Sequence, residues 1–389
     1  MTRNIQYKKL GEICNFISGG TPSKSKNEYW KNGNIPWIKI SDFKEKYIKF
    51  SEEKITKIGL ENSSAKILKK GTILYTIFAS VGKVAILDIE ATTNQAIVGI
   101  NLKEDNSIDK DFLYYFLSSI ENNIKKQARG VAQNNINISI LKNINIPILP
   151  MSFQKNIVKT LNKLENILEN FKQKKLLINF LNKSLFSRMF GDIKTNDKNW
   201  EIKKLGEVVQ TQYGTSKKAT SVVGEFPILR MNNITYFGEM DYKDLKYIEL
   251  SNSEKEKFLL KKGELLFNRT NSKELVGKTG LFNLDIPMAF AGYLIRIKPS
   301  NLIHSKFLLF FMNSEFMKKL LYNKAKNIVG MANINAKELE DFSIILPPIE
   351  LQKKFAERIE KIEKLSFEIE KSIKEAENLY NSLISKYFD

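Results

Sequence analysis

The chain has 389 residues, of which 42% are hydrophobic, enough to bury substantial cores and to exclude wholesale disorder. Lys and Arg number 62 against 43 Asp and Glu, and the net charge of +19 favours a polyanionic partner such as nucleic acid, unless lysine is simply abundant. A single cysteine, Cys14, and a single histidine, His304, exclude a disulfide framework, a cysteine-rich zinc site and most triad chemistry.

In chain order, residues 1–150 mix short β-like runs with Gly, Pro and Asn turns and one helix near 109–127, which is typical of an α+β globule. Residues 151–190 lack Gly and Pro and follow Pro150, which predicts a long helix. A linker at 191–200 comes next. Residues 201–348 then repeat the first pattern, with a helix near 305–325, and 349–389 repeat the long helix.

The two halves match in collinear order. The stretch "YKKLGEICNFISGGTPSK" (7–24) pairs with "IKKLGEVVQTQYGTSKK" (202–218), and "INIPILPMSFQKNI" (144–157) pairs with "FSIILPPIELQKKF" (342–355). The repeat is far too long for a solenoid, so the sequence predicts a duplicated domain.

Both predicted long helices carry apolar residues at alternating spacings of four and three, the seam of a coiled coil, and about 38 helical residues would span roughly 55 Å. The alternative is that each helix packs only on its own domain. A second apolar set lies off the seam and must pack on the chain's own globules or on other subunits. Its recurrence in both copies favours docking of other subunits, through Ile167, Leu181, Phe186 and Phe190, matched by Leu365, Leu379, Ile384 and Phe388.

The combination of "LGEICNFISGGTPSKSKNEYW", "IPWIKISD", "ASVGKVAIL", "TTNQAIV", "GVAQNNINISILKNINIPILP" and "FQKNIV" resembles the specificity subunit of type I restriction–modification systems, over nearly the whole chain. The resemblance implies two target-recognition domains, each reading one half of a split site in double-stranded DNA. It further implies a pseudo-two-fold arrangement, in which an antiparallel coiled coil separates these domains and docks two modification subunits, with restriction subunits completing the complex. The second copy has "YGTSK" for "GGTPS" and "FPILRMNN" for "IPWIKISD", as expected if the domains read different sequences.

Four loop regions recur and are polar or basic in both copies, so we expect their Lys and Arg to contact phosphates and other side chains to reach base edges. The first, for which an ordinary turn is the alternative, comprises Gly20, Thr21 and Lys24, with Gly214, Thr215 and Lys218. In the second, Asp would accept from cytosine, Asn would pair with adenine and Arg with guanine. Its residues are Lys39, Ser41 and Asp42, with Arg230, Asn232 and Asn233.

The third region contains "RTNSKELVGKTGLF" (269–282), whose Gly-Lys-Thr suggests a phosphate-binding P-loop. Ser272 stands where that loop needs a glycine, and strand-like sequence follows instead of a helix. A match to "TIFASVGKVAIL" (76–87) favours a DNA-facing loop, longer in the second copy. Its candidates are Ser80 and Lys83, with Asn268, Arg269, Thr270, Asn271, Ser272 and Lys278.

The fourth region follows the predicted short helix, and a glycine-ended helical turn explains it equally well. Its candidates are Arg129, Gln133 and Asn134 in the first copy and Lys326 and Asn333 in the second.

Motifs for catalysis are missing from the sequence. "LPPIE" (346–350) and "FISGG" (16–20) fall short of methyltransferase motifs, and Asp42-Phe43-Lys44 lacks the preceding Pro-Asp of a nuclease. We therefore expect S-adenosylmethionine, ATP and Mg²⁺ to be bound by partner subunits and not by this chain, which also offers no metal site. The alternatives are a self-sufficient restriction or modification enzyme with divergent motifs, and a coiled-coil scaffold without DNA specificity. Without a signal sequence or membrane-spanning run, a cytoplasmic location is expected.

Overall fold

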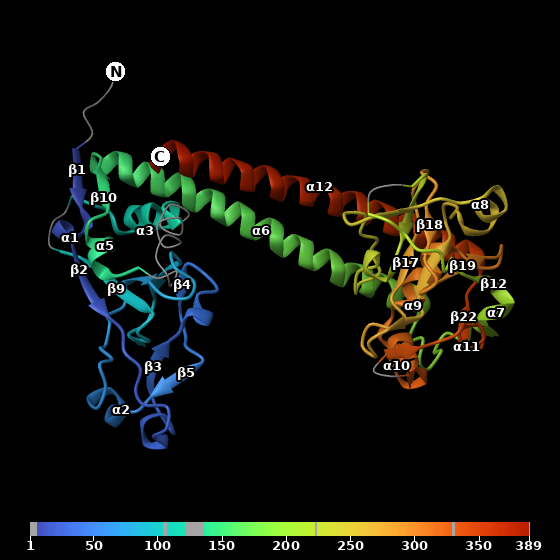
Figure 1. Ribbon diagram of the computed structural model, residues 1–389, viewed down its shortest axis with the longest axis horizontal. Coiled ribbons are helices and arrows are strands. Elements are labelled where there is room, and N and C mark those ends of the chain that lie inside the picture. Colours follow the sequence, from blue (N-terminus) through green and yellow to red (C-terminus); the bar gives the residue numbers. More distant parts are fainter. Residues whose placement is uncertain (1–5, 104–106, 122–135, 222–223, 329–330, 389) are drawn as a thin grey trace. The chain divides into compact units, whose positions relative to one another are not determined.

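The computed structural model describes residues 6–103, 107–121, 136–221, 224–328 and 331–388. They form two compact units, one of residues 1–172 with 371–389 and the other of 173–370. Each unit contains a globular α+β part joined to portions of two long helices (Figure 1). We call the globular parts the first head and the second head, in chain order.

The first head is built on a five-stranded sheet in the order β2-β9-β6-β7-β4 and a three-stranded sheet in the order β5-β3-β8. A third, two-stranded sheet pairs β1 with β10. The strands are β1 (Gln6–Lys9), β2 (Cys14–Ser18), β3 (Ile35–Ile38), β4 (Tyr47–Ile48), β5 (Glu53–Ile55), β6 (Ile73–Thr76), β7 (Val84–Leu87), β8 (Thr92–Thr93), β9 (Ile97–Leu102) and β10 (Asn145–Ile148). The helices are α1 (Leu10–Ile13), α2 (Lys57–Glu61), α3 (Lys110–Ser119), α5 (Ile138–Lys142) and the 3₁₀ turns η1 (Asn27–Tyr29) and η2 (Ile40–Asp42).

The second head repeats this topology, with sheets β12-β19-β15-β17, β14-β13-β18 and β11-β22, and adds a sheet β16-β21-β20. Its strands are β11 (Glu201–Lys204), β12 (Val209–Tyr213), β13 (Phe226–Leu229), β14 (Lys246–Ile248), β15 (Leu265–Asn268), β16 (Thr270–Asn271), β17 (Thr279–Leu281), β18 (Ala289–Phe290), β19 (Leu294–Pro299), β20 (Lys326–Ile328), β21 (Met331–Asn333) and β22 (Ser343–Leu346). Its helices are α7 (Leu205–Val208), α8 (Asn252–Phe258), α9 (Ser305–Met312), α10 (Glu315–Lys324), α11 (Ala336–Glu340) and the 3₁₀ turn η3 (Met231–Asn233).

The central strands of both heads are buried on both sides. In β6, Ile73 and Tyr75 join the core that contains α3, whereas Leu74 joins the core on the opposite side of the sheet. Leu265 and Leu266 of β15 divide between two cores in the same way. Because neighbouring strand residues point to opposite faces, a continuous apolar run is what a strand buried on both faces requires.

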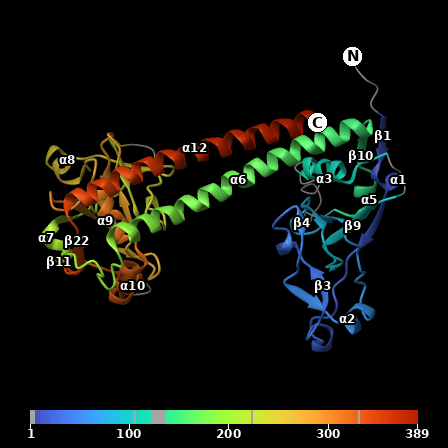
Figure 2. The same ribbon diagram turned by 180° about the vertical axis from the view of Figure 1, so that it is seen from behind.

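Two 40-residue helices, α6 (Met151–Phe190) and α12 (Ile349–Phe388), run antiparallel. In the first unit, Glu165 Oε1 accepts a 3.2 Å hydrogen bond from the Tyr380 hydroxyl. In the second, Lys175 forms a 2.7 Å ion pair with Glu370. Residues of increasing number along α6 thus contact residues of decreasing number along α12, as antiparallel helices require. Helix α3 lies beside the first half of α6, where the Tyr115 hydroxyl is 2.7 Å from the side-chain oxygen of Asn162 (Figures 1 and 2).

A buried glutamine ties the first turn of each long helix to the head before it. The Gln154 side chain accepts from the Asp109 backbone N–H at 2.8 Å and donates to the carbonyls of Ser107 and Leu149. Gln352 makes the same three bonds, accepting from His304 N–H and donating to two carbonyls. Both glutamines are fully buried. The "FQKN" and "LQKK" stretches therefore recur because their glutamine anchors each long helix to the head that precedes it.

The predicted fold class is confirmed: α+β, with two homologous heads and a pair of long antiparallel helices. Two local expectations differ from the structure. The helix expected near 305–325 is divided into α9 and α10, because Ser314 begins a new helix by accepting from Met317 N–H. The helix expected near 109–127 is described only as α3, which ends at Ser119. No helix in the described ranges is long and apolar enough to cross a membrane.

Candidate nucleic-acid interface

In the second head, the third and fourth predicted loop regions come together. Strand β16 pairs with β21, and Thr270 Oγ1 accepts a 2.9 Å hydrogen bond from Asn333 Nδ2. The Arg269 guanidinium donates to Asn333 Oδ1 at 3.2 Å and lies 4.8 Å from the centre of the Tyr213 ring. We call Tyr213, Arg269, Thr270 and Asn333 the Arg269 cluster. Two sequence regions 64 residues apart therefore form one polar surface.

Arg269 is the member of this cluster best suited to contact DNA. Its guanidinium has five N–H donors, its side chain is half-buried, and one donor bonds to Asn333. The Nε atom is buried and has no hydrogen-bond partner among the described residues, so only the other guanidinium donors are suited to DNA. Asn333 differs, because its oxygen and its nitrogen are both engaged. Asn333 therefore positions Arg269 and Thr270, and Thr270 is itself buried. Tyr213, half-exposed beside Arg269, was missed; an aromatic residue directly before the strand-end glycine was the available signal.

The loop that carries Arg269 has no structural equivalent of equal length in the first head. Ile136 N–H donates to the Ile77 carbonyl just as Ile334 N–H donates to the Arg269 carbonyl, so Ile77 occupies the place of Arg269. Ile77 is buried and apolar. The two heads thus differ in chemistry at a corresponding strand end.

Asn268 and Lys278, both predicted to contact DNA, have buried side chains. Asn268 is fully buried, and neither end of its amide has a partner among the described residues. Lys278 is 9% exposed, and its amine donates to the carbonyls of Met231 (3.1 Å) and Ile234 (2.6 Å). Burial lowers the pKa of Lys278. The Gly-Lys pair ends a turn in which Gly277 has φ +87°, a conformation that favours glycine.

The second predicted region is a pair of helix caps. The Asp42 carboxylate accepts from Lys39 N–H, and Asn233 Oδ1 accepts from Arg230 N–H, both at 2.9 Å. The Asn233 amide also donates to the carbonyls of Asp241 and Asp244, at 2.8 and 3.0 Å. Asp42 and Asn233, predicted to read bases, are thus buried and bonded to their own backbone. Asp and Asn recur here because either side chain, at the third residue of a 3₁₀ turn, accepts the backbone N–H of the residue before the turn.

The cations of this region are neutralised within their own heads. Lys39 pairs with Glu53 at 3.0 Å and Glu52 at 3.1 Å, and Arg230 pairs with Asp244 at 2.9 Å. Hydrogen bonds to Glu53 and Glu52 raise the pKa of Lys39. Ser41 and Asn232, one residue before each cap, are exposed.

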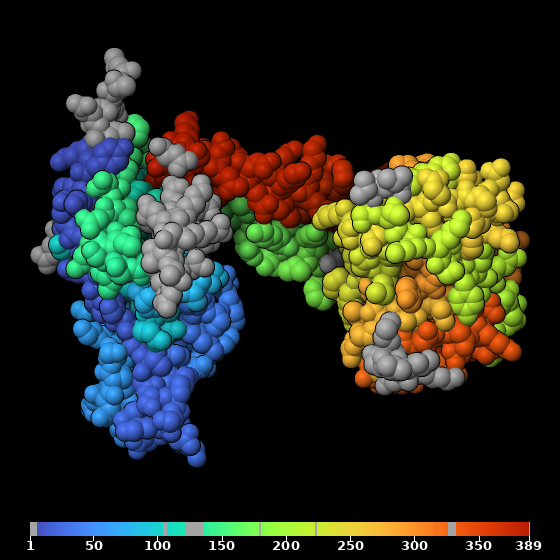
Figure 3. Space-filling model, viewed as in Figure 1, coloured from blue at the N-terminus to red at the C-terminus, as the bar shows by residue number. Residues whose placement is uncertain are grey.

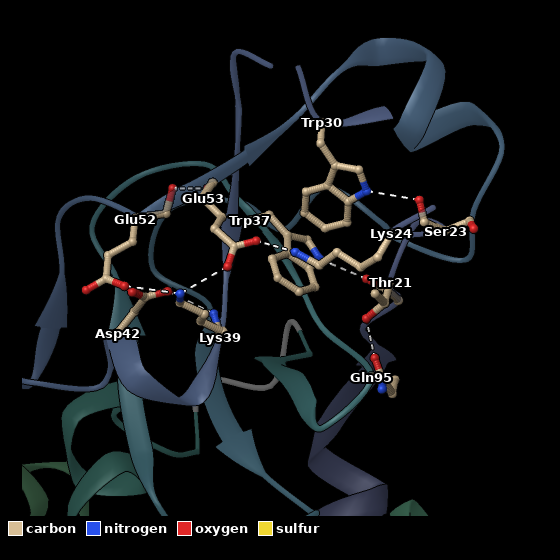
Figure 4. Close-up of polar contacts among 12 residues, drawn as sticks. Thr21, Ser23, Lys24, Trp30, Trp37, Lys39, Asp42, Glu52, Glu53 and Gln95 are labelled. Atoms are coloured by element: carbon tan, nitrogen blue, oxygen red, sulfur yellow. Dashed lines mark hydrogen bonds and ion pairs between the residues drawn. The ribbon is translucent and has the colours of Figure 1, made fainter. Parts of the chain in front are cut away.

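The first region forms an aromatic and ionic cluster in a lobe at one end of the first head (Figures 3 and 4). The Lys24 amine lies 3.5 Å from the centre of the Trp30 ring and 4.8 Å from that of Trp37, and it is ion-paired with Glu53. The two indoles meet edge to face at 4.9 Å. Cation–π contacts and the ion pair hold the lysine on this lobe, and the tryptophans that do so were missed.

The glycines of this region serve backbone packing. The Gly19 and Gly214 N–H groups both donate across to β9 or β19, so Gly19, and not Gly20, is the counterpart of Gly214. A Cβ atom on Gly19 would lie 2.0 Å from the Asn94 carbonyl oxygen, and one on Gly214 would lie 2.3 Å from that of Ala291. Gly20 is buried, and its carbonyl accepts from Trp37 Nε1. Gly20, predicted to approach a phosphate, therefore packs inside the head.

The other candidates lie in varied settings. Lys83 and Lys218 are exposed, Asn271, Ser80 and Ser272 are half-buried, the Thr21 hydroxyl donates to Gln95, and Thr215 is buried. Arg129, Gln133 and Asn134 lie outside the described residues, and for Lys326 only the backbone in β20 is described.

The second apolar set of the long helices divides in two. Phe186 and Phe190 are buried in the core of the second head, and Ile384 and Phe388 pack against the core of the first. These four residues, predicted to dock partners, therefore pack on the chain's own globules. The other four remain exposed, together with further apolar residues that the sequence pattern did not single out. Ile167 and Leu379 belong to the first unit. We call the exposed residues of the second unit the apolar helix surface: Leu176, Leu177, Phe180, Leu181, Leu365 and Phe367.

The structure thus defines a class of protein in which one α+β recognition scaffold occurs twice, with different polar loops at matching strand ends. A family model described as "Type I restriction modification DNA specificity domain" matches residues 2–179 and 197–377. The chain belongs to this family.

Relatives match nearly the whole chain. The type I restriction enzyme MjaIX specificity subunit of Methanocaldococcus jannaschii is 25% identical, over 99% of this chain and 92% of that protein. The EcoKI specificity subunit of Escherichia coli K12 is 27% identical, over 97% of this chain and 87% of that protein. A crystal structure of the type I restriction–modification S subunit from M. genitalium has the same fold, with a TM-score of 0.59, 18% identity and coverage of 100% of this chain and 98% of that one.

Proposed function

We propose that this chain is the DNA-specificity subunit of a type I restriction–modification complex, with each head reading one half of a bipartite site. The observation that carries the proposal is the separate match of each half of the chain to the DNA specificity domain. The two heads share one scaffold but carry different loops, and Arg269 of the second head lies where the first head has Ile77. Heads with different side chains at the same place suit a DNA site whose two halves differ in sequence. Specificity comes from side chains that reach base edges, and arginine bonding to guanine is the commonest such contact.

In this proposal the chain recognises DNA and performs no chemistry itself. Methyl transfer with S-adenosylmethionine, and translocation and cleavage with ATP and Mg²⁺, belong to modification and restriction subunits. The relatives named above are specificity subunits of restriction enzymes, which supports this division of labour.

We further propose that the apolar helix surface docks the modification subunits. Within the second unit, Leu177, Phe180 and Leu181 are 49–68% exposed at helical spacings of three and four, which places them on one side of α6. Covering a side chain of this kind contributes about 1.5–3 kcal/mol. Contiguous exposed apolar residues mark interaction surfaces, whereas singly scattered ones are normal on a surface.

The docking proposal is tested by co-purification with the modification subunit. L177S/F180S should abolish co-purification at micromolar protein while leaving the melting temperature of the chain unchanged. K163S/K174S, on exposed positions of the same helix, is the matched control. Retention of the modification subunit by L177S/F180S would contradict the proposal.

The proposed reading of DNA is tested by sequencing methylated sites in cells that express the chain with its modification subunit. The wild type should direct methylation to a split motif. R269A should relax or change one half of that motif and leave the other half intact, because a good bidentate contact to a base discriminates by about 1–3 kcal/mol. K298A, at an exposed strand position of the same head, should leave both halves unchanged. Equal change in both halves after R269A would contradict independent reading by the heads.

A further inference from the structure

A pocket of about 280 Å³ lies in the second head, just beyond the Arg269 cluster along the chain. One wall comes from the loop between β16 and β17, another from α10 and a third from the loop after η3. Its polar lining comprises Lys273, Glu274, Lys278, Lys318, Lys319, Tyr236 and Tyr322. It is smaller than the roughly 300–1,000 Å³ that pockets for drug-sized ligands occupy, so it suits a single small group.

Four lysines line this pocket, and none forms an ion pair with a carboxylate in the described part of the chain. Lys273 lies 4.6 Å from the centre of the Tyr322 ring, and Lys318 lies 4.1 Å from that of Tyr236. Glu315, whose charge acts on Lys318, is itself paired with Lys183 at 3.2 Å. Two of the four positive charges therefore lie against aromatic rings.

Two of the four amines are withdrawn from solvent. The Lys278 amine donates to the Met231 and Ile234 carbonyls, and the Lys318 amine donates to the Tyr236 carbonyl at 3.0 Å. Burial lowers the pKa of both lysines. A desolvated cation without a counter-ion is costly, and an anion placed between these amines removes that cost.

Glu274 is the acidic member of the lining, and its carboxylate is engaged elsewhere. Hydrogen bonds from its own backbone amide and from Ser272 lower the pKa of Glu274. These bonds hold the carboxylate on its own loop. The lining, with four lysines and one carboxylate, carries a net positive charge.

We infer that this pocket is a phosphate subsite, which holds one phosphate of the DNA backbone while Arg269 contacts the neighbouring bases. The inference rests on the proposed DNA-reading function and adds a sequence-independent anchor to it. The pocket and Arg269 share one loop, because Lys273 follows Arg269 by four residues, and this supports the inference. A phosphate contact fixes the register of a protein on DNA, and side chains beside it then read bases.

The test measures DNA affinity of the full chain, with its modification subunit, as a function of salt. Each phosphate contact contributes about 0.9 to the slope of log affinity against log salt. K273Q/K319Q should lower the slope by about 1, the contribution of one phosphate contact, and leave the methylated motif unchanged. K298Q is the matched control on an exposed strand of the same head. Equal slopes for K273Q/K319Q, K298Q and wild type would overturn a DNA phosphate in the pocket.

A second arm identifies a free phosphate as the source. Inorganic phosphate at millimolar concentration, compared with chloride at equal ionic strength, is titrated into the DNA-free chain while its melting temperature is followed. Stabilisation of wild type and K298Q, but not of K273Q/K319Q, would retain the phosphate subsite and assign it to free phosphate. The absence of an effect in both arms overturns the inference. If wild type itself shows no specific DNA binding, the proposed function fails independently of the pocket.

Discussion

Replacing Gln352 by alanine should detach the first turn of α12 from the second head. The substitution removes three hydrogen bonds, which link the buried side chain to His304 N–H (2.8 Å), Leu302 O (3.2 Å) and Pro347 O (2.7 Å). At about 1 kcal/mol for each bond, the local cost is about 3 kcal/mol. Since 1.4 kcal/mol corresponds to a factor of ten, the backbone amide of His304 should exchange with solvent about 100-fold faster.

Hydrogen–deuterium exchange of the full chain measures this change directly. Q154A should produce the same effect at Asp109, whose amide bonds to Gln154 in the first head. Q210A, which alters an exposed glutamine of β12, is the control and should leave both amides protected. Protection of His304 in Q352A equal to that in Q210A would refute the anchoring role.

Three other predictions concern the caps, a buried lysine and the helices. N233A should destabilise the second head by about 1–2 kcal/mol in urea unfolding, because a helix cap is lost, whereas exposed N232A should not; equal effects would contradict the capping role. The pKa of Lys278 is lowered from 10.5 in the folded chain, so between the lowered pKa and pH 10.5 the unfolded chain binds more protons than the folded chain. The stability of the folded chain should therefore rise as the pH increases through this window. Thermal melts of K278M should lack this pH-dependent contribution, whereas melts of K298M should retain it. Deletion of one heptad from both α6 and α12 shortens each helix by about 10 Å, and the unread spacer of the methylated site should shrink by roughly three base pairs; an unchanged spacer would contradict the helices as a ruler.

The repeated architecture could be predicted because it depends on patterns that survive in a single sequence. Collinear repeats predicted two like domains, and apolar heptads without Gly or Pro predicted α6 and α12. The buried strands were readable for a similar reason: β6 and β15 are continuous apolar runs between turn residues.

The candidate site was predicted less well because sequence records polarity and not exposure. Asp42 and Asn233 have the residue types of base readers, but they are buried caps. Lys278 has the type of a phosphate ligand, and its amine also donates to two carbonyls, which the sequence does not reveal. In each case a backbone group supplies the partner, and no side-chain pattern reveals it.

The same limit applies to apolar residues. Phe186 and Phe190 recur at helical spacing in a way that suits docking, yet the second head covers them with its own core. Leu177 and Phe180, which the pattern did not single out, are exposed. Only the tertiary structure separates an apolar residue that faces its own domain from one that faces outward.

The account depends most on the claim that each head reads DNA independently on an equivalent scaffold. The most direct measurement is the methylated motif directed by a chimaera in which residues 201–348 are replaced by residues 1–150. Two identical heads on antiparallel helices should convert the asymmetric site into an inverted repeat of one half. Continued methylation of the original asymmetric site would contradict the claim.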